Sequence, residues 1–216
     1  MNPIHRRTLV KFTASLLGTL TLAAAPLAHA QEAPTDLIGR VTNEVLDTIK
    51  ADKALQDGDI NRLMAVVDAK VMPNVNFSRM TSSATGPAWR QATAPQRQRL
   101  QQEFKTLLVH TYAGALRQVR NQTVDVLPLR AAAGDTEVVV RTLIRGQGDP
   151  VQVDYRLEKT PGQAPGWKIY DLNVMGVWLV DNYRPQFAQQ INAGGVDALV
   201  KSLVERNQTN AGEGKR

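Results

Sequence analysis

The sequence predicts an α+β domain in which several helices pack against a curved antiparallel sheet of about four strands. Two observations predict this class. Apolar residues recur at helical spacing from Leu37 to Gln118 and again after Gly176, whereas period-two alternation of apolar and polar residues dominates between Thr123 and Val174. Helices and strands that are segregated along one chain of this length indicate α+β packing in a single domain.

The first thirty residues have the composition of an export signal. Basic residues up to Lys11 precede an apolar stretch over residues 12–27, which ends in the small-x-small pattern Ala28-His29-Ala30. We therefore expect cleavage after Ala30 and a periplasmic domain over residues 31–206. The pair Arg6-Arg7 also fits a twin-arginine signal, but we favour the general secretory route because no cofactor that needs loading before export is predicted.

Composition excludes several function classes. The chain has no cysteine, so it has neither a thiol nucleophile nor a cysteine metal site. The formal net charge is +6, and it falls to about +3 once the three basic residues of the signal are removed. No run of Lys and Arg is interleaved with aromatic residues, so we expect no nucleic-acid partner.

Local signals place the individual elements. Asp36 precedes the first helix, Pro73 ends the second, and Thr93 to Gln96 form a capping box that opens the third. Helices are expected at residues 37–51, 59–71, 94–118, 178–191 and 196–204, with short helical turns and a loop over residues 74–92. Strands are expected at residues 123–129, 137–145, 151–157 and 167–174, and the polar tail 207–216 is expected to be disordered.

Candidates for catalysis are few. His110 is the only histidine outside the predicted signal, and no G-x-S-x-G elbow, P-loop, dinucleotide-binding motif or H-E-x-x-H pair accompanies it. One histidine cannot build a histidine zinc site. Asp149, Asp154 and Asp171 are carboxylates that a solvated or ion-paired role explains better than acid–base chemistry. We therefore predict no catalytic residue, no metal and no cofactor.

An ordered set of motifs in the C-terminal third carries a family resemblance. The set comprises the segments GWKIYDL at 166–172, GVWLV at 176–180, NYRPQF at 182–187 and GVDAL at 195–199, preceded by PNVNF at 73–77, the pair Trp89-Arg90 and the stretch 104–112. Over residues 36–205 the chain resembles the MlaC or toluene-tolerance auxiliary family of periplasmic phospholipid carriers. It departs from the family pattern at Met175, Trp178 and Pro185.

The resemblance implies a cone related to nuclear-transport-factor-2 (NTF2-like) that encloses an apolar cavity. It implies a monomer that shuttles a diacyl glycerophospholipid between an outer-membrane lipoprotein–porin complex and an inner-membrane ABC transporter with a substrate-binding ring, and so maintains outer-membrane lipid asymmetry. A diacyl lipid has on the order of thirty CH₂ groups, each worth about 0.8 kcal/mol when it is removed from water, so both tails need shelter. Two other functions stay open, which are an NTF2-like enzyme that uses His110 or a tyrosine with an aspartate, and a protein-binding periplasmic adaptor.

Given the resemblance, we expect one set of mainly apolar side chains to line the lipid cavity: Phe77, Met80, Trp89, Phe104, Leu107, Leu108, Val138, Val140, Val151, Val153, Tyr155, Ile169, Trp178 and Arg184. The alternating strand residues would look the same in an ordinary core. Arg184 has two interpretations. We favour a buried ion pair with Asp171 that ties the last strand to the next helix, and the alternative is a contact with the lipid phosphate.

Overall fold

The fold is described by a computed structural model that covers residues 32–132 and 134–213, so the predicted export signal and its cleavage site lie outside the described residues. The helical elements are α1 (Pro34–Ala51), α2 (Lys53–Asp57), α3 (Ile60–Val66), the π-helix η1 (Val67–Val71), the 3-10 helix η2 (Met72–Asn74), α4 (Phe77–Thr85), α5 (Ala88–Gln91), α6 (Ala94–Leu116) and α7 (Leu179–Glu213). The strands are β1 (Thr123–Val126), β2 (Glu137–Arg145), β3 (Val151–Lys159), β4 (Trp167–Val174) and β5 (Val177–Trp178).

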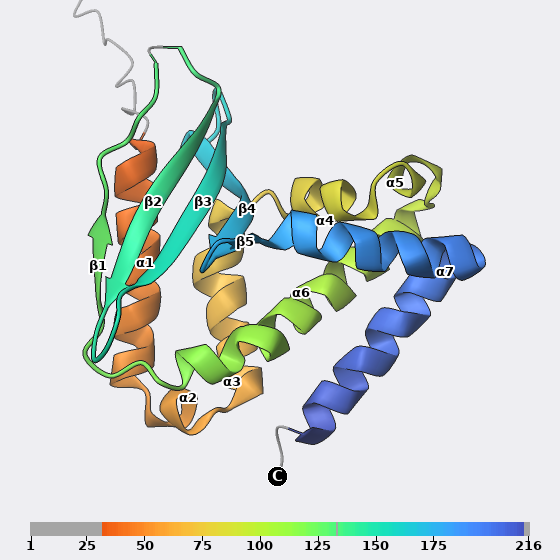
Figure 1. Cartoon of the computed structure of the whole chain (residues 1–216), viewed down its shortest axis with the longest axis horizontal. Helices are drawn as coiled ribbons and strands as arrows, with labels where there is room; N and C mark the ends of the chain where they lie inside the picture. The colour runs from red at the N-terminus through yellow and green to blue at the C-terminus, as the bar shows by residue number, and fades with distance from the viewer. Residues whose placement is uncertain (1–31, 133, 214–216) are drawn as a thin grey trace, which may run out of the picture. The chain divides into compact units, whose positions relative to one another are not determined.

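The strands form one open antiparallel sheet in the order β1-β2-β3-β4-β5 (Figure 1). This confirms the α+β class and the antiparallel sheet, with five strands where about four were expected. The additional strand arises because Met175 (φ 52°) and Gly176 (φ 89°) both adopt positive φ and turn the chain back, so that Val177 pairs with Val174. The expected helix at residue 178 therefore begins one residue later, at Leu179.

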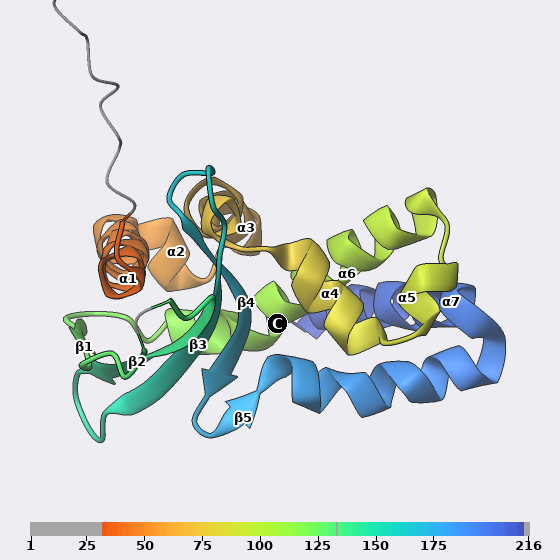
Figure 2. The same ribbon diagram turned by 90° about the horizontal axis from the view of Figure 1, so that it is seen from above.

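Helix α1 covers one face of the sheet, and the described elements leave the opposite face without a helix (Figure 2). The apolar stripe of α1, formed by Leu37, Ile38 and Val41, is buried against alternate residues of the strands. We call this group the sheet cluster, and its buried members are Leu37, Ile38, Val41, Val138, Val140, Tyr155, Leu157, Trp167 and Ile169.

A second apolar cluster lies among the helices. We call it the helical cluster, and its buried members are Phe77, Met80, Ala84, Leu100, Phe104, Leu107, Leu179, Val180, Tyr183, Phe187, Leu199 and Leu203. Phe104 of α6 lies at its centre, because its ring centroid is 5.7 Å from that of Phe77, 5.0 Å from Tyr183 and 5.1 Å from Phe187. Aromatic pairs at such distances add to the stabilisation from burial.

A third apolar cluster joins the end of α1 to α2, α3 and the end of α6, with Leu46, Leu55, Leu63, Val109 and Ala113 among its buried members. Helix α2 was not expected as a separate element. It forms because the Asp52 side chain caps its N-terminus and Gly58, at φ 93°, ends it in the left-handed conformation.

The span α7 consists of two helices, as the sequence predicted, because the backbone at Gly194 and Gly195 is not helical and separates them. The first helix continues through Pro185, and the second reaches Glu213, beyond the expected end at residue 204. The prediction of a disordered tail from residue 207 was wrong for residues 207–213. The buried Asn207 amide donates hydrogen bonds to the backbone oxygen of Glu103 (3.0 Å) and to its carboxylate (2.7 Å), which holds the last turns of α7 on α6.

Asn207→Ala should lower the free energy of unfolding by about 1–3 kcal/mol, because it leaves the buried Glu103 carboxylate without one of its donors. Urea denaturation of the mature chain measures this loss. The matched control is Gln208→Ala, an exposed position one residue along the same helix, which should change stability by less than about 0.5 kcal/mol. Equal effects of the two substitutions would show that the Asn207 amide does not hold the tail.

Candidate functional site

The helical cluster and the sheet cluster meet at a narrow junction. Among the described residues, Val75 and Leu172 are the two that pack against both clusters. Val75 forms a parallel bridge with Ile169 of β4, and the Asn76 N–H donates to the Ile169 carbonyl at 2.8 Å. We call Val75 and Leu172 the cluster junction. It is the place where two apolar bodies of different secondary structure come together.

Half-buried apolar side chains border both clusters. Met72, Trp89, Leu108 and Tyr112 border the helical cluster, and Val126, Leu129 and Val153 border the sheet cluster. Apolar surface that a fold leaves partly uncovered beside its core is suited to an apolar ligand, because binding removes it from water.

The helical cluster contains six of the predicted lipid-lining residues. Phe77, Met80, Phe104 and Leu107 are buried in it, while Leu108 and Trp89 are half-buried at its border. Trp89 also lines a shallow hollow between α4 and α5, where the guanidinium of Arg97 lies 5.5 Å from its ring. The structure thus brings these six side chains together, on three consecutive helices, α4, α5 and α6.

The sheet cluster contains five more. Val138, Val140, Tyr155 and Ile169 are buried, and Val153 borders the cluster. Val140 has no exposed surface and faces α1, so in this structure it is ordinary core. The Tyr155 hydroxyl lies 3.4 Å from the Thr42 hydroxyl, and burial raises the pKa of Tyr155, so the ring stays neutral within the cluster.

Three predicted residues lie apart from both clusters. Val151 is exposed at the start of β3. Trp178 lies in β5 beneath the guanidinium of Arg156, 3.8 Å from the ring centroid. Arg184 is exposed on α7, where it donates to the Ser83 carbonyl at 3.1 Å and pairs with Asp181 at 3.6 Å.

The predicted ion pair between Asp171 and Arg184 is wrong. Asp171 instead accepts hydrogen bonds from the Leu172 N–H (2.9 Å), the Val180 N–H (3.1 Å) and Arg156 (2.8 Å). The carboxylate therefore does tie β4 to α7, but through the backbone at the start of the helix and through a neighbouring strand. Arg156 was missed, although alternation places it on the sheet face opposite Tyr155 and Leu157.

Burial shifts the pKa of Asp171. Its side chain is 1 % exposed, and this desolvation raises the pKa of the carboxyl even though three donors and the charge of Arg156 act to lower it. The protonated carboxyl is thus favoured in the folded chain more than in the unfolded chain.

The described residues offer little for chemistry. No group of three or more His, Asp or Glu side chains among residues 32–132 and 134–213 is placed to hold a metal ion. His110 is half-buried on α6, and burial lowers its pKa. Within the part of the chain that the structure describes, no helix is both long and apolar enough to cross a membrane.

Fold and site together define an α+β protein with two apolar clusters that meet at one junction. A family model described as "MlaC protein" matches residues 39–205, and the chain belongs to the MlaC family. It is similar to the toluene tolerance protein ttg2D of Pseudomonas putida, with 30% identity over 178 residues, which are 82% of this chain and 81% of that protein.

Two further relatives are similar over most of their length. The intermembrane phospholipid transport system binding protein MlaC of Haemophilus influenzae is 24% identical over 181 residues, which cover 82% of this chain and 84% of that protein. The solved phospholipid-binding protein of Ralstonia solanacearum, in complex with a phospholipid, is 46% identical with a TM-score of 0.79, and the match covers 83% of this chain and 99% of that one.

Asp171→Asn should change how stability depends on pH. A raised folded pKa means that the stabilisation from the protonated carboxyl is complete below the unfolded value of about 3.9 and is lost as the pH rises through the folded value. The wild type should therefore lose stability relative to the variant as the pH rises from about 3.5. Urea denaturation at several pH values measures the difference. Asp181→Asn, a half-exposed neighbour of Arg156, is the control, and a difference between wild type and Asp171→Asn that is constant with pH would contradict the account.

Proposed function

We propose that the chain is a non-enzymatic, periplasmic carrier of diacyl glycerophospholipid, whose acyl chains lie between the helical cluster and the sheet cluster. One observation carries the proposal. The Ralstonia protein, whose chain is matched over 99% at 46% identity, was solved in complex with a phospholipid. Membership of the MlaC family and the name of the Haemophilus relative support the same function.

The architecture is suited to sheltering tails. The helical cluster is built from α4, α6 and α7, the sheet cluster from α1 and the strands, and the cluster junction connects them. Separating the two bodies at this junction would open the predicted cavity of an NTF2-like cone, with an apolar wall on each side. Each buried CH₂ contributes about 0.8 kcal/mol, so the tails themselves stabilise the open form.

The chain segment that leads into the junction has the geometry of a hinge. The π-helix η1 and the 3-10 helix η2 interrupt the regular α-helical hydrogen-bond pattern just before Val75, and no residue of η1 is buried. Irregular helical turns of this kind are common where a helix adjusts to function. We infer that a change in the backbone of η1 and η2 would move Val75 relative to α3.

The transport cycle follows from the family resemblance. The carrier takes phospholipid from one membrane complex and delivers it to the other, between an outer-membrane lipoprotein–porin complex and an inner-membrane ABC transporter with a substrate-binding ring, and thereby maintains outer-membrane lipid asymmetry. It works as a monomer and exchanges lipid passively, because the sequence has no nucleotide-binding motif of its own. Export through the signal over residues 1–30 brings it to the periplasm.

Solvent extraction of the purified chain followed by mass spectrometry tests the proposal. The wild type should release about one phospholipid per chain. Leu172→Trp fills the cluster junction and should reduce retained phospholipid about tenfold, because the indole occupies space that the acyl chains need. Leu108→Trp, at the border of the helical cluster, should act in the same direction.

The control is Leu143→Trp, which is half-buried and lies on the face of β2 away from α1. It should keep its lipid, and thermal unfolding with circular dichroism should show that all three variants are folded. A wild type without lipid in repeated preparations would favour the protein-binding adaptor. Turnover of an added small molecule by the lipid-free chain, lost on His110→Ala, would favour the enzyme.

A further inference from the structure

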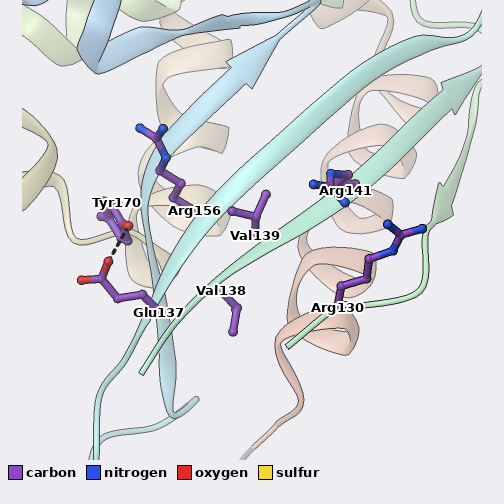
Figure 3. Close-up of a pocket in the computed structure, with 7 residues that line it drawn as sticks. All are labelled: Arg130, Glu137, Val138, Val139, Arg141, Arg156 and Tyr170. Atoms are coloured by element: carbon purple, nitrogen blue, oxygen red, sulfur yellow. Dashed lines mark hydrogen bonds between the residues drawn. The ribbon is translucent and has the colours of Figure 1, made fainter. Parts of the chain in front are cut away.

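The sheet face opposite α1 carries an open hollow of about 340 Å³ that the lipid proposal does not use. Figure 3 looks onto this face, with α1 behind the strands. Three arginines line the hollow, namely Arg130, Arg141 and Arg156, and we call them the arginine face.

Strand register brings two of these arginines together. Val139 of β2 is the cross-strand partner of Arg156 on β3, and Arg141 follows Val139 by two residues on the same face of the sheet. Arg130 comes from the segment after β1, which stays beside β2 because the Leu127 N–H donates to the Arg141 carbonyl at 2.9 Å. Strand register thus fixes Arg141 and Arg156, and Arg130 joins them from the segment between β1 and β2.

The one acid that lines the hollow is already engaged. Glu137 accepts from Arg79 at 2.6 Å and from the Tyr170 hydroxyl at 2.9 Å, and these bonds lower the pKa of its carboxyl. Arg79 comes from α4, outside the hollow, and its guanidinium lies 3.6 Å from the centroid of the Tyr170 ring. Glu137 is therefore ionised and paired with Arg79 rather than with the arginine face.

The three arginines differ in how far their guanidinium groups are already paired within the protein. Arg156 is held between the buried Asp171 carboxylate (2.8 Å) and the Trp178 ring (3.8 Å), yet 31% of its side chain is exposed. Arg130 and Arg141 are exposed, and neither lies in an ion pair with another described residue. A guanidinium has five N–H donors in a planar fork that matches a carboxylate. The buried Asp154 lies directly across the strands from Arg141, but its carboxylate accepts from the Gln152 amide and forms no ion pair with Arg141 among the described residues. Arg156 is neutralised by Asp171 and lies 3.7 Å from Asp181, so Arg130 and Arg141 supply the guanidinium forks that remain for a partner.

We propose that the arginine face docks an acidic segment of a protein partner. A flat, open hollow on an uncovered sheet face suits a macromolecule better than a small ligand. A bilayer surface is the weaker match, because the apolar residues of the hollow are the largely buried Val138 and half-buried Val139, and no exposed apolar side chain is available there for insertion. Carboxylates fixed on a protein can instead pair bidentately with the guanidinium forks.

The docking surface is separate from the lipid site. Val140 points to the sheet cluster, whereas Val139 and Arg141 point to the hollow on the other side of the same strand; Val138 is buried in the sheet cluster and borders the hollow. A partner bound to the arginine face therefore leaves the cluster junction free. Loss of docking and loss of lipid are separable by measurement.

Fluorescence anisotropy with a fluorescein-labelled hexaglutamate peptide tests the proposal on the mature full-length chain. The peptide should bind at low salt and dissociate as salt rises, because the contact is electrostatic. Arg141→Glu should weaken binding about tenfold or more, and Arg130→Glu should act in the same direction. The matched control is Arg145→Glu on the same strand and face, where Arg145 pairs with Asp125 outside the hollow; it should stay within about threefold of the wild type.

Lipid content by mass spectrometry should be equal in all three variants, so a failure here is distinct from a failure of the carrier proposal. No peptide binding by the wild type, or equal loss in Arg141→Glu and Arg145→Glu, would overturn the proposal. A third result would also overturn it: the wild type binds vesicles that contain half phosphatidylglycerol but not the peptide, and Arg141→Glu abolishes vesicle binding. The arginine face would then bind a membrane and not a protein.

Discussion

The buried carboxylate of Asp171 is the interaction on which the arrangement of the two halves depends. It lies on β4, accepts from the backbone at the start of α7 through the Val180 N–H, and holds Arg156 of β3. Helix α7 supplies much of the helical cluster, so this carboxylate sets where that cluster stands relative to the sheet. The same group fixes Arg156 on the opposite face. One buried acid thus positions both the apolar interior and a member of the arginine face.

A lipid carrier needs a fold that stays stable while the ligand in its interior binds and leaves. Here the stable parts are the helical cluster and the sheet cluster, in each of which buried aromatic and aliphatic side chains pack on one another. In the proposed carrier, the part that opens is the junction between them, where Val75 and Leu172 contact both clusters. Because each cluster keeps its own packing, entry of acyl chains at the junction need not unfold either one.

The sequence predicted the regular elements well where one local pattern, such as alternation or a capping box, was clear. The bounds of β2 and β4 agree with the expected strands at 137–145 and 167–174, and the capping box at Thr93 and Gln96 does open α6. The end of α7 was missed because a polar helix has no apolar stripe, and its anchor is a hydrogen bond from Asn207 to a residue of α6 far away in the sequence. Long-range contacts of that kind are not visible in local composition.

The site was harder to predict for the same reason. Alternation selected Val138, Val140, Val153 and Tyr155 but could not separate core from cavity wall, which depends on where α1 lies. Asp171 was correctly expected to tie β4 to α7, but its partner was assigned to the nearby Arg184 instead of to Arg156 across the strands. Pairing across a sheet follows from register, and a β-bulge between Arg156 and Leu157 shifts it in this region.

Photo-crosslinking from inside the bound lipid tests the central claim most directly. A phospholipid with a diazirine near the end of one acyl chain is loaded onto the chain and irradiated, and the modified residues are identified by peptide mass spectrometry. The account predicts modification at Val75 and Leu172 and at bordering residues of both clusters, such as Leu108 and Val153. Modification confined to one cluster, or to the sheet face that carries Arg141, would contradict the claim that the tails lie between the two apolar clusters.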